Sequence, residues 1–297
     1  MKHSPAILVL MVSFFLLSQL IGLAVVSQYV VVRQVEGKTE VSVADLPLGI
    51  ERPAIYDSSA AFIPAFIAVI IGTAVLLFLM RLGKVFLFKI WYYLAVSICL
   101  TIAFAAFLNT VVAAGLGIAV TSFKVFRPNP IVHNLSEIFI YGGLAAIFVP
   151  MFNVVGAVAL LLVMSAYDIY AVSGSKHMVS LARFQASSNV FAGLAIPYVP
   201  QKGGIAQRGR KRPKGVLRMQ HAPVAVLGGG DMGLPLLFAG VVMKEIGLLK
   251  ALVIPVFAAV ALLLLLYKGE KGKFYPAMPF ITAGCLMGYA VIKVLLV

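Results

Sequence analysis

The sequence has few charged residues, since only 11% of its 297 residues are Asp, Glu, Lys or Arg. A soluble chain carries roughly 25% charged residues, so this composition excludes an ordinary soluble domain. Acidic residues are the scarcer type, with ten against 24 Lys and Arg. The sequence also has just two cysteines, Cys99 and Cys285, in separate apolar segments. That placement favours small core side chains over a disulfide or a thiolate metal site.

Hydrophobic residues are what the sequence has in excess. They make up 62% of the chain, and the mean hydropathy is +1.05. Several apolar runs reach the roughly 20 residues that a helix needs to cross a bilayer. The sequence therefore predicts an all-α, polytopic membrane protein that forms one helical bundle.

The apolar runs divide the chain into nine predicted transmembrane helices. We expect one break within 86–123, either at Asn109 and Thr110 or at Gly115 and Gly117. The first run is longer than the apolar core of a cleavable signal peptide, about 7–15 residues, so we interpret it as a retained signal anchor. The predicted spans are 6–32, 59–80, two helices within 86–123, 135–149, 151–172, 223–243, 250–267 and 276–297.

The positions of the basic residues predict the orientation. The loop after the first helix is acidic, whereas the segment 173–222 has nine Lys and Arg and no acidic residue. Because Lys and Arg concentrate in cytoplasmic loops, this places 173–222 and the amino terminus in the cytoplasm and the carboxyl terminus outside. The chain then has a six-helix part, 1–172, the basic loop, and a three-helix part, 223–297. We expect the basic residues to face anionic lipid headgroups and not nucleic acid.

Two aspartates lie where charge is costly. A carboxylate near the centre of a membrane helix costs roughly 2.5–3.5 kcal/mol to insert, and Asp231 falls within the apolar run 222–243. We identify Asp168 as the only other acidic residue deep in an apolar run. In the predicted topology the sixth helix descends to the cytoplasmic face and the seventh rises from it. We therefore predict that Asp168 and Asp231 lie at similar depth and form one site.

Such a pair has a defined chemistry. Two carboxyl groups a few ångströms apart do not both ionise easily, so one keeps its proton and the other acts as a base on a water between them. This is the arrangement of aspartic proteases, and it predicts a bell-shaped pH dependence. Gly228, expected one helical turn before Asp231, and Gly230 leave room for a close backbone. Pro235 predicts a kink at the aspartate.

Three ordered motifs resemble those of the presenilin and signal peptide peptidase family of intramembrane aspartyl proteases. They fall on the predicted sixth, seventh and ninth helices, and the predicted orientation is that of the presenilin branch, with an archaeal member as the nearest resemblance. The motifs are Tyr167-Asp168, Gly228-Gly229-Gly230-Asp231 and Pro276-Ala277-Met278-Pro279.

The resemblance implies roles for these residues. Asp168 and Asp231 would be the catalytic pair, with Tyr167 as the aromatic partner of the first. Gly228 and Gly230 would open space at the second. Three further residues would line the site and position the substrate backbone: Pro276, Ala277 and Met278. The family usually has Leu where Met278 stands, and the similar volume of the two side chains should preserve the contact.

The resemblance also implies the activity. The substrates would be membrane-spanning helices of client proteins, cut by water at a peptide bond inside the bilayer of the cell membrane. No metal or organic cofactor is implied, and the four histidines have no spacing typical of metal ligands.

Two other classes remain as alternatives. In a transporter or channel, Asp168 and Asp231 would bind a proton or cation, although nothing within 6–123 repeats the Gly-rich aspartate pattern. A prepilin-type peptidase shares Gly-x-Gly-Asp but has fewer helices. The spacing Gly228-x-Gly230-x-x-Gly233 also fits a dinucleotide fingerprint, but we expect no strand before it.

Part of the segment 173–222 has structural signals of its own. We expect 176–184 to extend the sixth helix as an amphipathic helix on the membrane surface. The apolar stretch 190–196 is expected to touch lipid or to fill a groove.

Overall fold

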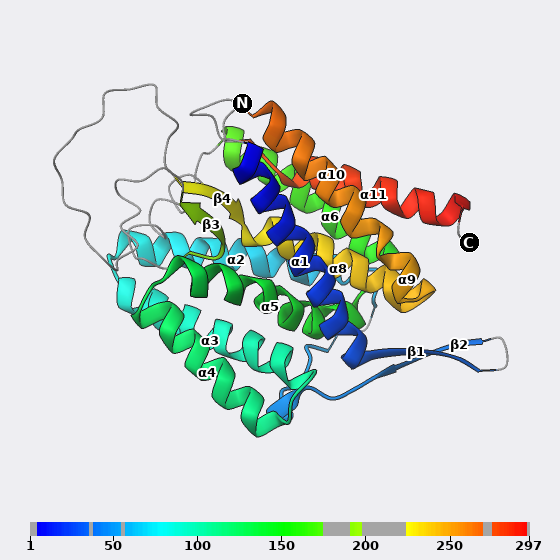
Figure 1. The fold of residues 1–297 in the computed structure, drawn as a ribbon, viewed down its shortest axis with the longest axis horizontal. Coiled ribbons are helices and arrows are strands. Elements are labelled where there is room, and N and C mark those ends of the chain that lie inside the picture. Colours follow the sequence, from blue (N-terminus) through cyan, green and yellow to red (C-terminus); the bar gives the residue numbers. More distant parts are fainter. Residues whose placement is uncertain are drawn as a thin grey trace.

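The computed structural model describes residues 5–35, 38–54, 57–174, 191–197, 224–269 and 275–295. Within these ranges the chain is mostly helical, with two short antiparallel hairpins (Figure 1). The predicted amphipathic helix at 176–184 and most of the basic loop lie outside the described residues.

The helices follow the predicted apolar runs. A turn of π-helix, Tyr170–Gly174, follows α6, and the 3-10 turns η1 and η2 cover Pro47–Gly49 and Val149–Met151. The helices are α1 (Pro5–Tyr29), α2 (Phe62–Arg81), α3 (Val85–Ala105), α4 (Thr110–Phe126), α5 (Pro130–Phe148), α6 (Val154–Ile169), α8 (Gly229–Ile246), α9 (Leu248–Ala251), α10 (Val253–Lys268) and α11 (Met278–Leu295).

The strands form two hairpins. In the first, β1 (Val30–Val35) pairs with β2 (Lys38–Val43), and this hairpin projects from the helices (Figure 1). In the second, β3 (Gly193–Pro197) pairs with β4 (Val224–Gly228). The second hairpin lies against α5, at the start of α8.

Seven helical segments in the described part of the chain are long and apolar enough to cross a membrane. The other two predicted spans correspond to α4, which has 17 residues, and to α8, which contains Asp231, Lys244 and Glu245. The chain is therefore a multi-pass membrane protein, and the count of nine spans stays a prediction.

The predicted break within 86–123 is found at its first candidate position. Asn109 precedes α4, and its side chain accepts the N–H of Val112 at 3.0 Å, which satisfies one of the free donors of the helix start. Gly117 lies inside α4 instead of breaking it. A Cβ there would be 2.9 Å from the backbone N of Thr101, so glycine lets α4 approach α3 closely.

The start of the predicted seventh helix was wrong. Residues 224–228 form β4, and α8 begins only at Gly229. Val224 and Val226 are β-branched and favour a strand that has a partner, while consecutive glycines disfavour helix. The predicted ninth helix likewise starts late, because Pro276 and Ala277 precede α11.

The centre of the bundle is α8, which packs against α1, α5, α6, α10 and α11 (Figure 1). Its side chains from Leu236 to Met243 are buried, and Phe238 is among the largest fully buried side chains. In contrast, α2 has no buried residue, and it contacts α6 and α3. Asp231 is therefore carried by a helix that packs against five others and is largely buried beyond Leu234.

Candidate active site

Asp168 lies in the last turn of α6 and is 6% exposed. Its Oδ2 accepts the backbone N–H of Met278 at 3.1 Å. Met278 is the first residue of α11, where N–H groups have no partner inside the helix. Asp168 therefore caps α11 and connects α6 to the Pro276-Ala277-Met278 segment.

A second polar contact joins the same two helices. The hydroxyl oxygens of Ser165 on α6 and Thr282 on α11 are 2.8 Å apart, and both side chains are buried. Ser165 precedes Asp168 by about one turn, and Thr282 follows Met278 by about one turn. The Asp168–Met278 contact is therefore part of a two-point connection between α6 and α11.

Asp231 is the third residue of α8, and its carboxylate lies beside Gly228. One carboxylate oxygen lies 3.2 Å from the place that a Cβ of Gly228 would occupy. The Gly-rich motif is thus a helix start, with Gly228 in extended conformation just before it.

This geometry corrects two expectations. Asp231 was expected near a helix centre, and Gly228 on the same helical face, whereas Asp231 is in the first turn and Gly228 precedes the helix. Pro235 lies in the next turn and leaves the carbonyl of Asp231 without its helical donor. Asp231 lies in the first turn of α8, so no helical segment precedes it. The kink that was predicted at this residue therefore has no place there.

The two aspartates come from neighbouring helices at corresponding ends. The last turn of α6 and the first turn of α8 belong to helices that pack together, and the two carboxyl groups interact electrostatically. The structure therefore brings together Asp168, Asp231, Ala277 and Met278. Two neighbouring carboxyl groups can act as a general acid and a general base.

Three other predicted site residues lie at the edge of this group. The ring of Tyr167 packs edge-on against Phe66 of α2, with centroids 6.0 Å apart, and its hydroxyl lies 3.4 Å from that of Thr73. Tyr167 thus connects Asp168's helix to α2. Gly230 is exposed, and a Cβ there would meet no described atom within 4 Å. Pro276 is half-buried just before α11.

The stretch 190–196, which was expected to touch lipid or to fill a groove, contains the start of β3. Leu194, Ala195 and Ile196 are buried. Gly193 lies opposite Gly228 and has φ +131°, a conformation that side chains rarely adopt. A Cβ at Gly193 would also lie 3.0 Å from the backbone N of Gly229 and collide with the carbonyl of Leu227.

The expectation that no strand precedes the Gly-rich motif was also wrong, because β4 ends at Gly228. The dinucleotide interpretation still fails. A dinucleotide fingerprint requires a β-α-β unit, whereas β4 pairs antiparallel with β3 and leads into a helix of a membrane bundle.

A buried ion pair, not predicted from the sequence, lies next to β3. Lys124 Nζ lies 2.5 Å from Glu137 Oε1, and their side chains are 2% and 1% exposed. Glu137 is therefore a third acidic residue in an apolar run, and Lys124, just past the predicted span that ends at 123, lies in the last turn of α4. The sequence does contain a pattern that indicates this cluster. His133, Glu137 and Tyr141 are spaced four residues apart, which places three polar side chains on one face of α5.

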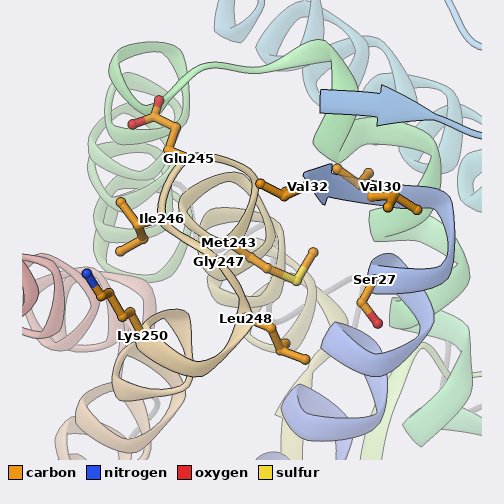
Figure 2. A pocket seen from close by; sticks show the side chains of 10 residues that line it. Ser27, Val30, Val32, Met243, Glu245, Ile246, Gly247, Leu248 and Lys250 are labelled. Carbon is orange, nitrogen blue, oxygen red and sulfur yellow. The ribbon is translucent and has the colours of Figure 1, made fainter. Parts of the chain in front are cut away.

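A cavity of about 530 Å³ lies elsewhere, between the end of α1, β1 and the end of α8 (Figure 2). Val30, Val32, Met243 and Leu248 are among its lining residues. Met243 follows Asp231 by twelve residues, about 18 Å along a helix, so this cavity is separate from the aspartates. Among the residues that the structure describes, no three His, Cys, Asp or Glu side chains are grouped to hold a metal ion.

Comparison with known proteins gives one family and one fold. A family model described as signal-peptide peptidase, presenilin aspartyl protease matches residues 12–297. Two solved structures, each described as a presenilin family intramembrane aspartate protease, have 18% sequence identity to this chain. No curated protein sequence matches.

Both solved structures superpose over nearly the full length. The one in space group C222 has a TM-score of 0.58 and covers 95% of this chain and 94% of its own. The one in space group P2 has a TM-score of 0.61 and covers 96% of each chain. At this identity the likeness establishes the fold of the bundle.

Proposed function

The chain belongs to the signal-peptide peptidase and presenilin family of aspartyl proteases, and we therefore propose that it hydrolyses peptide bonds within the membrane-spanning helices of client proteins. Asp168 and Asp231 form the proposed catalytic pair. The observation that carries this proposal is the packing of α6 against α8, with Asp168 in the last turn of α6 and Asp231 in the first turn of α8.

In the proposed mechanism the two carboxyl groups share one proton and bind one water. The ionised carboxylate takes a proton from the water as its oxygen attacks the carbonyl carbon, and the protonated group donates to the carbonyl oxygen. The resulting diol collapses as the C–N bond breaks and the nitrogen takes up a proton. The products are a carboxylic acid and an amine, and no cofactor takes part.

The substrate has to be unwound before this reaction. The amides of a helix are shielded by their own hydrogen bonds, and once freed in the bilayer they need partners from the enzyme. We propose that an extended client segment docks beside Pro276, Ala277 and Met278. The open space at Gly230 supports this placement, because an extended backbone can approach Asp231 there.

The proposed topology has nine spans, with α4 and α8 counted among them. The amino terminus and the basic segment 173–222 face the cytoplasm, and the carboxyl terminus faces outward, in the cell membrane. The nine basic residues of that segment support this orientation.

The test uses the purified protein in lipid vesicles with a single-span reporter protein. We expect two fragments whose masses place the cut inside the span, and a bell-shaped pH dependence of the initial rate, because the shared-proton state exists only between two ionisations. A parent protein that cuts no such reporter, yet conducts protons or cations across the same vesicles, would make the aspartates an ion site.

A backbone substitution tests the Asp168–Met278 contact. Met278→Pro removes the donated N–H, yet proline is well tolerated at the first position of a helix. Loss of a hydrogen bond to a charged group costs about 1.5–3 kcal/mol, so we expect cleavage per folded molecule to slow by about 10- to 150-fold, together with a lower unfolding temperature because the buried Met278 side chain is also lost. Met278→Leu keeps the N–H and is the matched control. Equal rates for the two variants would show that the contact does not contribute to catalysis.

A further inference from the structure

We propose that α5 is a side-chain template that fixes the register of β3, and through β4 the position of Asp231. Its positioning residues are His133, Asn134 and Glu137. The inference rests on the proposed function for its catalytic consequence, whereas its structural part can be tested without any cleavage.

The backbone of β3 is bonded on one edge by side chains of α5. The N–H of Gly193 donates to Glu137 Oε2 at 3.1 Å, and His133 Nε2 lies 2.8 Å from the carbonyl oxygen of Gly193. Asn134 pairs with both groups of Ala195: its Oδ1 accepts the N–H at 2.9 Å, and its Nδ2 donates to the carbonyl at 3.0 Å.

These contacts follow the two-residue period of a strand. Gly193 and Ala195 direct their backbone groups to α5, so those of Leu194 and Ile196 face β4. The three α5 side chains therefore replace a third strand. The bonds on that edge specify which residue of β3 stands at each position. A slip by one residue would direct the backbone groups of Leu194, not those of Ala195, to Asn134.

The template itself is held by buried polar contacts. Lys124 Nζ bonds Glu137 Oε1 and lies 2.8 Å from Ser136 Oγ. Tyr141 donates its hydroxyl to Glu137 Oε2. On α3, Tyr92 donates to the carbonyl of Phe191 at 3.0 Å, just before β3. Glu137 is thus fixed by three partners, Lys124, Tyr141 and Gly193.

The register of β3 determines where α8 begins, and Asp231 is in the first turn of α8. Gly193 stands opposite Gly228, and the N–H of Gly229 donates to the carbonyl of Ala192 at 3.2 Å. Tyr141 also limits the helix start, since a Cβ on Gly229 would lie 2.9 Å from its hydroxyl. A one-residue slip would turn every β3 side chain to the other face and move the start of α8.

The first measurement is a disulfide between β3 and β4. Ala195 and Val226 are opposite each other in a pair without mutual hydrogen bonds, where side chains are closest. Ala195→Cys/Val226→Cys should cross-link under mild oxidant, and the off-register pair Ala195→Cys/Leu227→Cys should not. Adding Asn134→Leu should lower the first yield and raise the second. Asn109→Leu, which removes an asparagine from the exposed start of α4, is the matched control and should change neither.

The second measurement is catalytic. A misplacement near 1 Å can cost about 10²-fold in rate, so Asn134→Leu should lower kcat by about 10- to 100-fold with KM within about twofold. Asn134→Asp keeps the acceptor for the Ala195 N–H and loses the donor, so it should give an intermediate kcat and cross-link yield. If Asn134→Leu does not fold, Asn134→Asp decides the test.

Two outcomes overturn the template. One is an unchanged cross-linking pattern in the folded Asn134 variants. The other is a lower unfolding temperature with unchanged kcat, which would make Asn134 a stabilising residue only. A parent that cross-links in register and responds to Asn134→Leu, but cuts no reporter, would refute the proposed function and leave the template standing.

Discussion

Asp168→Asn and Asp231→Asn each reduce reporter cleavage by at least about 10³-fold, and the double variant is no slower than either single one. General acid and base catalysis contributes about 10²–10⁴-fold, and residues that act as one unit lose their effect together. Asparagine has nearly the shape of aspartate but cannot carry the exchanged proton. Its side-chain oxygen can still accept the N–H of Met278, so the connection between α6 and α11 should persist.

The measurement is the initial rate of fragment formation by mass spectrometry, together with the unfolding temperature of each variant. Asp57→Asn is the matched control, because Asp57 is an exposed aspartate whose Oδ1 accepts the N–H of Ser59 at 2.8 Å. It should keep the parent rate. A double variant slower than each single one by the product of their effects would mean that Asp168 and Asp231 act independently, and the shared-proton mechanism would be wrong.

Lys124→Met lowers the free energy of unfolding by about 3–5 kcal/mol, the typical cost of leaving one member of a buried ion pair without its partner. Glu137 would remain enclosed with its bonds to Tyr141 and Gly193 but without a countercharge. Removing both charges avoids that penalty. The double variant Lys124→Met/Glu137→Gln should therefore recover most of the lost stability.

Unfolding in mixed micelles with increasing denaturing detergent measures these differences. Lys84→Met is the matched control, since Lys84 is exposed just before α3, and its change should stay within about 0.5 kcal/mol. Equal unfolding curves for Lys124→Met and the parent would show that the pair adds nothing to stability. A double variant less stable than both single variants would show that the Lys124–Glu137 contact itself is not what stabilises this region.

The aspartate variants and the Lys124 variant test different things: the first remove a catalytic group, and the second removes a structural support. The aspartate variants should be folded and inactive, because Asp168 and Asp231 lie at helix ends and the amide form of Asp168 can keep the bond to the N–H of Met278. The Lys124 variant should be less stable while its aspartates remain intact. Activity measured per folded molecule therefore distinguishes a lost catalytic group from a lost support.

Much of this protein follows from local composition. Hydropathy is a sum over neighbouring residues, so the apolar runs predicted a helix in every expected segment, the break before Thr110 and a multi-pass membrane protein. The family was also predicted correctly from three short motifs, and the match over residues 12–297 confirms it. The assignment of Asp168 and Asp231 as catalytic residues stays a prediction.

Contacts between distant residues had to come from the tertiary structure. Val224–Gly228 is as apolar as the helix that follows, and it is a strand because β3, about thirty residues earlier, offers its backbone groups. The ion pair of Lys124 with Glu137 joins two helices, and the backbone N–H of Met278 bonds a carboxylate more than a hundred residues earlier in the chain. Helix formation and insertion depend on each segment's own residues, whereas strand register, ion pairing and helix capping depend on partners that only the packed fold brings within bonding distance.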